Sequence, residues 1–197
     1  MLFSLNKNTL LIVLTVMKQL IVIIAVIFPL VLSGQPIEEG KVDRQLLADM
    51  LKERVDSLRA EKGLHALKRD KTLDKAAKDH AAYILKTGSF GHFQENNPKM
   101  RTPRQRIVHY GGDYRITAEN VLQSFLLIPV MSFFEDLDYT KLDTYPKTAA
   151  ELAEGWSTSP GHYRNIMMER FTHTGMAISY DPKTHIVYAV QVFGGEE

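Results

Sequence analysis

Residues 155–165 read Gly-Trp-Ser-Thr-Ser-Pro-Gly-His-Tyr-Arg-Asn and contain the one tryptophan of the chain, Trp156. The run Ser159-Pro160-Gly161 is a turn signal, so we expect a helix to end there. This helix should begin at Thr148, because Thr148 and Glu151 have the spacing of a capping box. Trp156 on such a helix is expected to be buried. A short helical turn over His162–Met167 should follow.

Two further helices are predicted upstream of this stretch. From Asp43 to Leu58 the apolar residues recur at helical spacing, and Gly63 should end that helix. A second helix should have Asp70 as its N-cap and stop at Gly88. Residues 91–114 contain glycines, prolines and asparagines with few periodic apolar positions, so we expect an irregular loop.

The C-terminal part of the chain is predicted to be a β-hairpin. Gly175–Tyr180 and His185–Phe193 are rich in strand-forming residues, and the segment 181–184 between them reads as a turn. Helices come first and paired strands last, which favours an α+β fold with helices packed on an antiparallel sheet.

The N-terminal segment 1–34 has the pattern of an export signal. Lys18 precedes an uncharged apolar run from Leu20 to Leu32, and the small residues Ser33 and Gly34 follow. Joined to the apolar residues before Lys18, the run would also be long enough for an uncleaved membrane anchor. Either alternative predicts a secreted, periplasmic or cell-envelope protein, with membrane contact only through an uncleaved N-terminal segment.

Composition excludes several classes of function. The chain has no cysteine, so disulfides, cysteine-zinc sites and thiol nucleophiles are absent. Removing residues 1–34 takes away Lys7 and Lys18, and the formal net charge changes from +1 to −1. Such a nearly neutral domain lacks the clustered basic residues that nucleic-acid binding requires, so we expect no nucleic-acid partner.

Five ordered sequence blocks resemble a known family. The blocks are Leu58–Leu64 with Leu67, Leu73–Ala77, Gly91–Phe93, Ala118–Asn120 and Gly155–Asn165. Together they are similar to a bacterial-type domain of the CAP superfamily, the cysteine-rich secretory, antigen 5 and pathogenesis-related proteins. The resemblance runs from about Leu46 to Phe193 and implies one domain over residues 42–197, folded as a three-layer α-β-α sandwich with a central antiparallel sheet. It also implies a cleft holding two histidines and acidic residues.

The resemblance assigns His92, His162 and Glu119 to the cleft, with Asn120 and Asn165 beside them. Where many eukaryotic relatives have a second cleft glutamate, this chain has Ser159, so a site of two histidines and two glutamates is in doubt. The other five histidines are expected on the surface or in the core. They are His65, His80, His109, His173 and His185.

Two imidazoles and a carboxylate can bind a divalent metal, with zinc the first candidate. Glu119 has two alternatives to direct ligation: it could orient a ligand from behind, or accept backbone N–H bonds that hold the loop. Ser159 with His162 is weak evidence for a serine nucleophile, because no orienting acid is apparent, and Ser159 should serve the turn with Pro160.

Three functions remain open. The first is an exported binding domain whose cleft takes a divalent metal and a small amphipathic or lipid-like ligand, the property that the resemblance most often implies. The second is a metal-assisted hydrolase of peptide or ester bonds, with Glu119 as general base. The third is an envelope interaction module with no active cleft. An apolar insertion around residues 125–147 is a candidate flap over the cleft, or ordinary core.

Overall fold

The computed structural model describes residues 37–38, 41–126 and 144–196. The predicted export segment 1–34 and most of the apolar insertion lie outside these residues, so both remain predictions. Within the described part of the chain, no helix is long and apolar enough to cross a membrane.

The two upstream helices agree closely with their predicted ends. Helix α2 spans Arg44–Ala60, and the Asp43 side chain caps it by accepting two backbone N–H bonds. Helix α3 spans Lys71–Thr87 and is capped in the same way by Asp70. Gly88 follows α3 with a φ of 71°, the left-handed conformation that glycine adopts without strain.

The predicted loop 91–114 contains a helix that was not foreseen. Helix α4 spans Pro103–His109 and begins at Thr102, whose hydroxyl accepts the backbone N–H of Gln105 while the Gln105 side chain accepts that of Thr102. This is a capping box, and Thr102-Pro103-Arg104-Gln105 carried its signal in the sequence. The prediction of an irregular loop is therefore wrong for these seven residues.

The tryptophan helix begins earlier than predicted. Helix α5 spans Tyr145–Thr158 with Thr144 at its N-cap, so Thr148 lies inside the helix and is 4% exposed. Pro146 in the first turn sets the earlier start, because proline is well suited to a position whose N–H has no helical partner. The predicted end is confirmed: Ser159 separates α5 from helix α6, which spans Pro160–Ile166. Trp156 is fully buried.

Four strands form one sheet in the order β1-β3-β4-β2. Strands β3 and β4 are the predicted hairpin, and β2, which no pattern indicated, pairs antiparallel with β4 along its whole length. The short strand β1 is parallel to β3, so the sheet is antiparallel except at this edge. The strands span Lys68–Arg69 (β1), Ile116–Phe125 (β2), Phe171–Asp181 (β3) and Ile186–Gly195 (β4).

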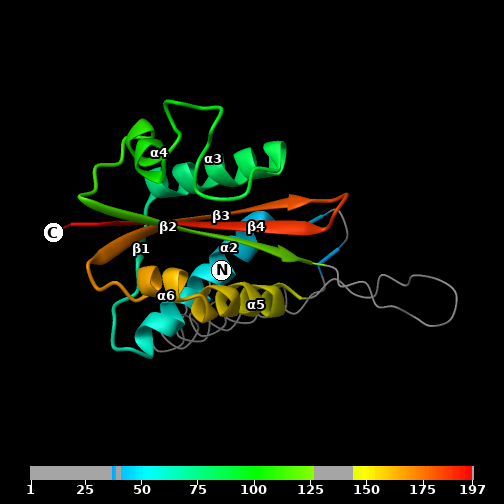
Figure 1. Cartoon of the computed structure of the whole chain (residues 1–197). Helices are drawn as coiled ribbons and strands as arrows, with labels where there is room; N and C mark the ends of the chain where they lie inside the picture. Colours follow the sequence, from blue (N-terminus) through cyan, green and yellow to red (C-terminus); the bar gives the residue numbers. More distant parts are fainter. Residues whose placement is uncertain (1–36, 39–40, 127–143, 197) are drawn as a thin grey trace, which may run out of the picture. The chain divides into compact units, whose positions relative to one another are not determined.

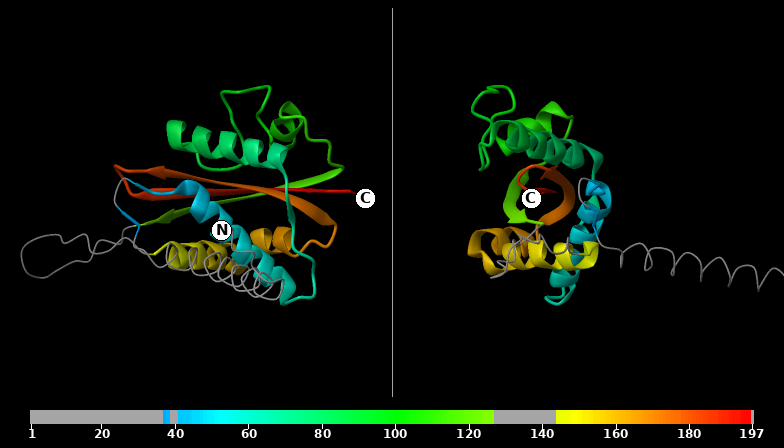
Figure 2. Two further views of the ribbon diagram at one scale, coloured as in Figure 1. Left: turned by 180° about the vertical axis from the view of Figure 1, so that it is seen from behind. Right: turned by 90° about the vertical axis from the view of Figure 1, so that its right-hand side faces the viewer.

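Helices cover both faces of the sheet (Figures 1 and 2). Helices α3 and α4 lie on one face, and α2, α5 and α6 lie on the other. Each face has its own apolar core, one around Leu73, Ala77 and Val190, the other around Trp156 and Phe193. The α+β class and the three-layer α-β-α sandwich are thus confirmed. Strand β2 forms one edge of the sheet, and the candidate site lies along it.

Candidate functional site

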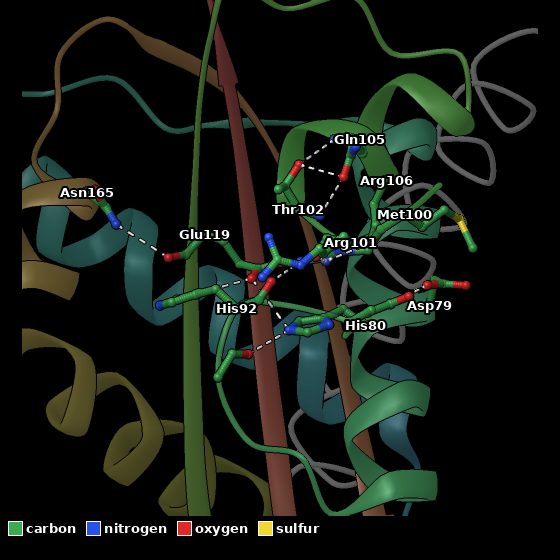
Figure 3. Close-up of polar contacts among 12 residues, drawn as sticks. Asp79, His80, His92, Met100, Arg101, Thr102, Gln105, Arg106, Glu119 and Asn165 are labelled. Atoms are coloured by element: carbon green, nitrogen blue, oxygen red, sulfur yellow. Dashed lines mark hydrogen bonds and ion pairs between the residues drawn. The ribbon is translucent and has the colours of Figure 1, made fainter. Parts of the chain in front are cut away.

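Glu119 lies in the middle of β2, and its side chain is only 1% exposed. One carboxylate oxygen, Oε2, accepts a hydrogen bond of 2.6 Å from Nη2 of Arg106 on α4. Arg106 is itself fully buried, so this is an ion pair removed from water (Figure 3). A buried charge pair requires further hydrogen bonds to offset the lost hydration.

Arg106 supplies those bonds by holding the loop between α3 and α4. Its guanidinium donates to the main-chain carbonyls of His92 at 3.1 Å, Met100 at 3.2 Å and Arg101 at 3.1 Å. The five donors of a guanidinium lie in one rigid plane, so a single side chain can fix several loop carbonyls at once. Helix α4 therefore anchors the loop that carries His92 to strand β2.

His92 is oriented by Glu119 from behind. Its Nδ1 lies 3.0 Å from Oε1 of Glu119, and its side chain is 46% exposed. A carboxylate that bonds one imidazole nitrogen fixes the tautomer and the ring orientation. The other ring nitrogen of His92, Nε2, is then the atom that can bind a ligand.

His80 is a member of this cluster that sequence reasoning missed. It lies on the buried face of α3, is fully buried, and bonds the carbonyl of Gly91 through Nε2 at 2.7 Å. The same Nε2 lies 3.6 Å from Oε1 of Glu119. Burial lowers the pKa of His80, which favours the neutral ring. The available signal was a histidine on the apolar face of a helix; of the two positions expected for it, surface or core, His80 takes the core.

His162, on α6, lies within electrostatic reach of His92. Partial burial, and then the positive charge of His92, lower the pKa of His162. Its Nδ1 is buried and has no hydrogen-bond partner among the described residues. That these two histidines, from a loop and a helix distant in sequence, share one site remains a prediction.

Glu119 and Asn120 are consecutive residues of β2, and successive side chains of a strand point to opposite faces of a sheet. The two side chains therefore bond elements on opposite faces. Glu119 bonds α4 and the His92 loop on one face. On the other face, Asn120 donates to the carbonyl of His162 at 3.2 Å and accepts from Asn165 at 2.9 Å. Asn165 also donates to the carbonyl of Glu119 at 3.5 Å. Asn120 and Asn165 thus bond each other and α6 on the face of β2 opposite the Glu119 side chain, and their part in a cleft remains a prediction.

Ser159 has a structural position at the junction of α5 and α6. Its side chain makes no capping bond, and its carbonyl accepts the N–H of Tyr163 at 2.8 Å. Its contribution to the cleft remains a prediction. Among the described residues, no group of three or more His, Asp or Glu side chains is arranged to hold a metal ion.

Comparison with known proteins identifies the family. The family model described as the cysteine-rich secretory protein family, CAP, matches residues 52–193. The chain belongs to the CAP family. The uncharacterized protein YkwD of Bacillus subtilis (strain 168) is 25% identical over 118 residues, which cover 60% of this CAP chain and 37% of that relative. The match therefore spans little more than a third of the relative's length.

Solved structures share the CAP fold. An outer surface protein from Borrelia burgdorferi superimposes with a TM-score of 0.58 at 20% identity, over 83% of this chain and 99% of that one. An extracellular protein containing an SCP domain from Bacillus anthracis gives 0.59 at 19% identity, over 82% of this chain and 45% of that one. At identities this low, the superpositions establish the common fold alone. The function of this CAP domain therefore has to be inferred from its own site.

Proposed function

We propose that this CAP protein is an exported binding domain whose cleft holds a divalent cation, zinc first, between His92 and His162. The observation that supports the proposal is the bond from the buried carboxylate of Glu119 to Nδ1 of the half-exposed His92. A carboxylate behind a histidine is the arrangement that presents the other ring nitrogen to a metal.

The donor set of the cleft fits a metal through its two histidines. Both oxygens of Glu119 are already bonded, Oε2 to Arg106 and Oε1 to His92, so Glu119 is placed to orient a ligand instead of being one. The unpartnered Nδ1 of His162 is a second imidazole atom that lacks a bond within the described residues. Two histidines leave the remaining coordination positions to water or to a bound molecule.

An amphipathic ligand fits the surroundings of His92. The loop that carries His92 exposes two aromatic side chains, Phe90 at 53% and Phe93 at 48%. Exposed apolar groups beside polar ones are typical of ligand sites. We infer that such a ligand contacts these rings and the metal together. Mass spectrometry of lipid extracted from the purified protein tests this inference, and protein that carries no lipid and binds none added would contradict it.

A metal-assisted hydrolase is the second candidate, in which His92 and His162 would hold the metal and the metal would activate water for attack on the substrate. The Glu119 side chain is almost fully buried. If it acted as the general base, the proton would have to reach it through His92. Turnover of peptide or ester substrates that a chelator abolishes and zinc restores would favour the hydrolase. If neither turnover nor ligand binding is found, the envelope interaction module remains.

Export is the expected consequence of Lys18, the apolar run Leu20–Leu32 and the small residues Ser33 and Gly34. The intact mass of protein recovered from the envelope or the medium tells cleavage from anchoring. Full-length protein found solely in the soluble cytoplasm would contradict the proposed location.

Zinc calorimetry tests the metal site. His92→Ala and His162→Ala should each remove most zinc binding, because each removes one of the two imidazoles. Glu119→Gln should weaken binding by about 10–100-fold, the usual effect of losing a group that orients a ligand. His173→Ala is the matched control and should bind zinc as the parent does. If either cleft variant binds zinc like the parent, with its fold intact by circular dichroism, the two histidines do not share a site.

A further inference from the structure

At the edge of the sheet opposite the histidine cleft, the described strands pair over a short stretch only. Strand β1 pairs with β3 only at His173 and Thr174, whereas β3 continues to Asp181. Beyond Thr174, no other described strand pairs with the outer edge of β3. Figure 2 shows β3, in orange, running between α3 and α2, which flank this edge.

Hydrogen bonds at the start of the edge show which residues of β3 face outward. The carbonyl of Thr174 accepts the N–H of Asp70 at 2.9 Å. Two residues on, the Met176 N–H donates to Oδ1 of Asp74 at 2.9 Å, and the Met176 carbonyl accepts from Arg69 at 3.0 Å. In an antiparallel pair, residues alternate between bonding the partner strand and facing away from it. The next outward-facing residue is Ile178.

Ile178 presents its N–H and its carbonyl to a cavity instead of to a partner. Among the described residues, no hydrogen bond satisfies either group from the outer side. The residue is 7% exposed, and buried main-chain groups in proteins are almost always paired. The adjoining cavity of about 410 Å³ is lined by aliphatic side chains from both helices, among them Ala48, Ala81 and Leu85.

The charges around the cavity favour an acidic occupant. Two carboxylates line the cavity, and both already have partners. Asp74 forms an ion pair with Arg69 at 2.5 Å, and Asp43 accepts the backbone N–H bonds that cap α2. Arg44 and Lys78 also line the cavity, are exposed, and have no ion-pair partner within the described part of the chain. Two unpaired cations at the rim complement negative charge on a ligand.

We propose that this groove, defined by Arg44, Ala48, Lys78, Ala82 and Ile178, binds an extended acidic peptide segment of another protein by strand addition to β3. A peptide main chain supplies both a donor and an acceptor for Ile178, which a lipid chain or a metal ion does not. Alternate side chains of the peptide would reach the aliphatic wall, and an Asp or Glu would meet Arg44 or Lys78. The proposal is independent of the metal site at the opposite edge.

Selection from a phage library of random decapeptides tests the groove, with the protein as recovered from expressing cells as the target. Selected peptides should combine alternating apolar residues with Asp or Glu. Their synthetic forms should bind about tenfold more weakly or worse to Ala82→Trp, which fills the groove, and to Lys78→Glu, which reverses its charge. Both positions are exposed on α3, so these variants should fold. The matched controls Ala60→Trp, at the end of α2, and Lys86→Glu, on α3 outside the groove, should bind like the parent.

Methylation of successive peptide nitrogens separates strand addition from other modes of binding. Affinity should fall at alternate positions only, because alternate residues of a strand bond one neighbour. The Ile178 amide should exchange its hydrogen more slowly when peptide is bound. The proposal is overturned if no peptide is selected, if Ala82→Trp leaves binding unchanged, or if methylation shows no alternation. It is also overturned in favour of a second copy if the protein forms dimers that Ala82→Trp dissociates.

Discussion

At the scale of single residues, the buried pair Arg106–Glu119 holds the site together. Each member is fully or almost fully buried, and the two atoms that join them lie 2.6 Å apart. Taking two charges out of water is costly, so removing one partner leaves the other charge uncompensated. The pair thus couples the stability of the domain to the orientation of His92.

Arg106→Met should lower the free energy of unfolding by about 3–5 kcal/mol at neutral pH, because it leaves the Glu119 carboxylate buried without a cation. Urea unfolding measures the loss. Arg101→Met, which removes an exposed ion pair to Glu95, should cost less than about 1 kcal/mol. The double variant Arg106→Met/Glu119→Leu should recover much of the stability, and a double variant no more stable than Arg106→Met would show that the charge pair is not the cause.

At the scale of elements, Gly175 is the point where β3 meets the start of α3. A Cβ placed there would lie 2.0 Å from the carbonyl carbon of Leu73 and 2.1 Å from the nitrogen of Asp74. Both are backbone atoms, so the clash cannot be relieved by a side-chain rotation. Close contact of helix and sheet therefore requires a glycine at this position.

Gly175→Ala should separate α3 from β3 and lower the free energy of unfolding by about 3 kcal/mol, the upper end for overpacking. Gly161→Ala is the control, because among the described residues no atom beyond its chain neighbours and its own helix backbone lies within 4 Å of the added methyl group. It should change stability by less than about 0.5 kcal/mol. Equal unfolding midpoints in urea for the two variants would contradict this account of the helix–sheet contact.

The sequence predicted elements whose signals are local. Asp70 was predicted to cap a helix and Gly88 to end it, and the structure confirms both; Asp43, where the predicted first helix starts, proves to be a cap as well. The same kind of signal at Thr102 was overlooked, and α4 was missed with it. Strand β2 could not be found in this way, because its ten residues mix buried and exposed positions without regular alternation and acquire their structure by pairing with β4.

The family resemblance supplied the candidate site residues, and their roles remain predictions, whereas residues whose roles depend on packing were not predicted. His92, His162 and Glu119 were assigned from their motifs. Arg106 and His80 were not, since an arginine in a predicted loop and a histidine on an apolar helix face indicate nothing until the fold brings them to Glu119. Their partners lie 13 and 39 positions away in sequence, beyond any local pattern.

At the scale of the whole molecule, the site joins all three layers. His80 comes from a helix on one face, Glu119 from the sheet, and His162 from a helix on the other face. Burial is the largest cause that lowers the pKa of His80 and of His162. Protonation of either ring therefore lowers the stability of the folded domain, and protonation of His162 also opposes metal binding.

This arrangement predicts a loss of stability in mild acid. Above the unfolded histidine pKa of about 6.5, both rings are neutral in the folded and unfolded chains, so neither makes stability depend on pH. Below that pH, the unfolded chain takes up protons that the buried rings of the folded chain do not. The free energy of unfolding should therefore fall with pH until the lowered pKa values of the folded chain are reached, by at most about 1.4 kcal/mol per pH unit for each ring.

Urea unfolding midpoints between pH 8 and pH 5, measured with a chelator present, should show this dependence of stability on pH as a slope. His80→Gln should flatten it and His173→Gln should not, because His80 lies inside the cluster and His173 outside it. A slope unchanged in His80→Gln would mean that the acid sensitivity comes from elsewhere in the molecule.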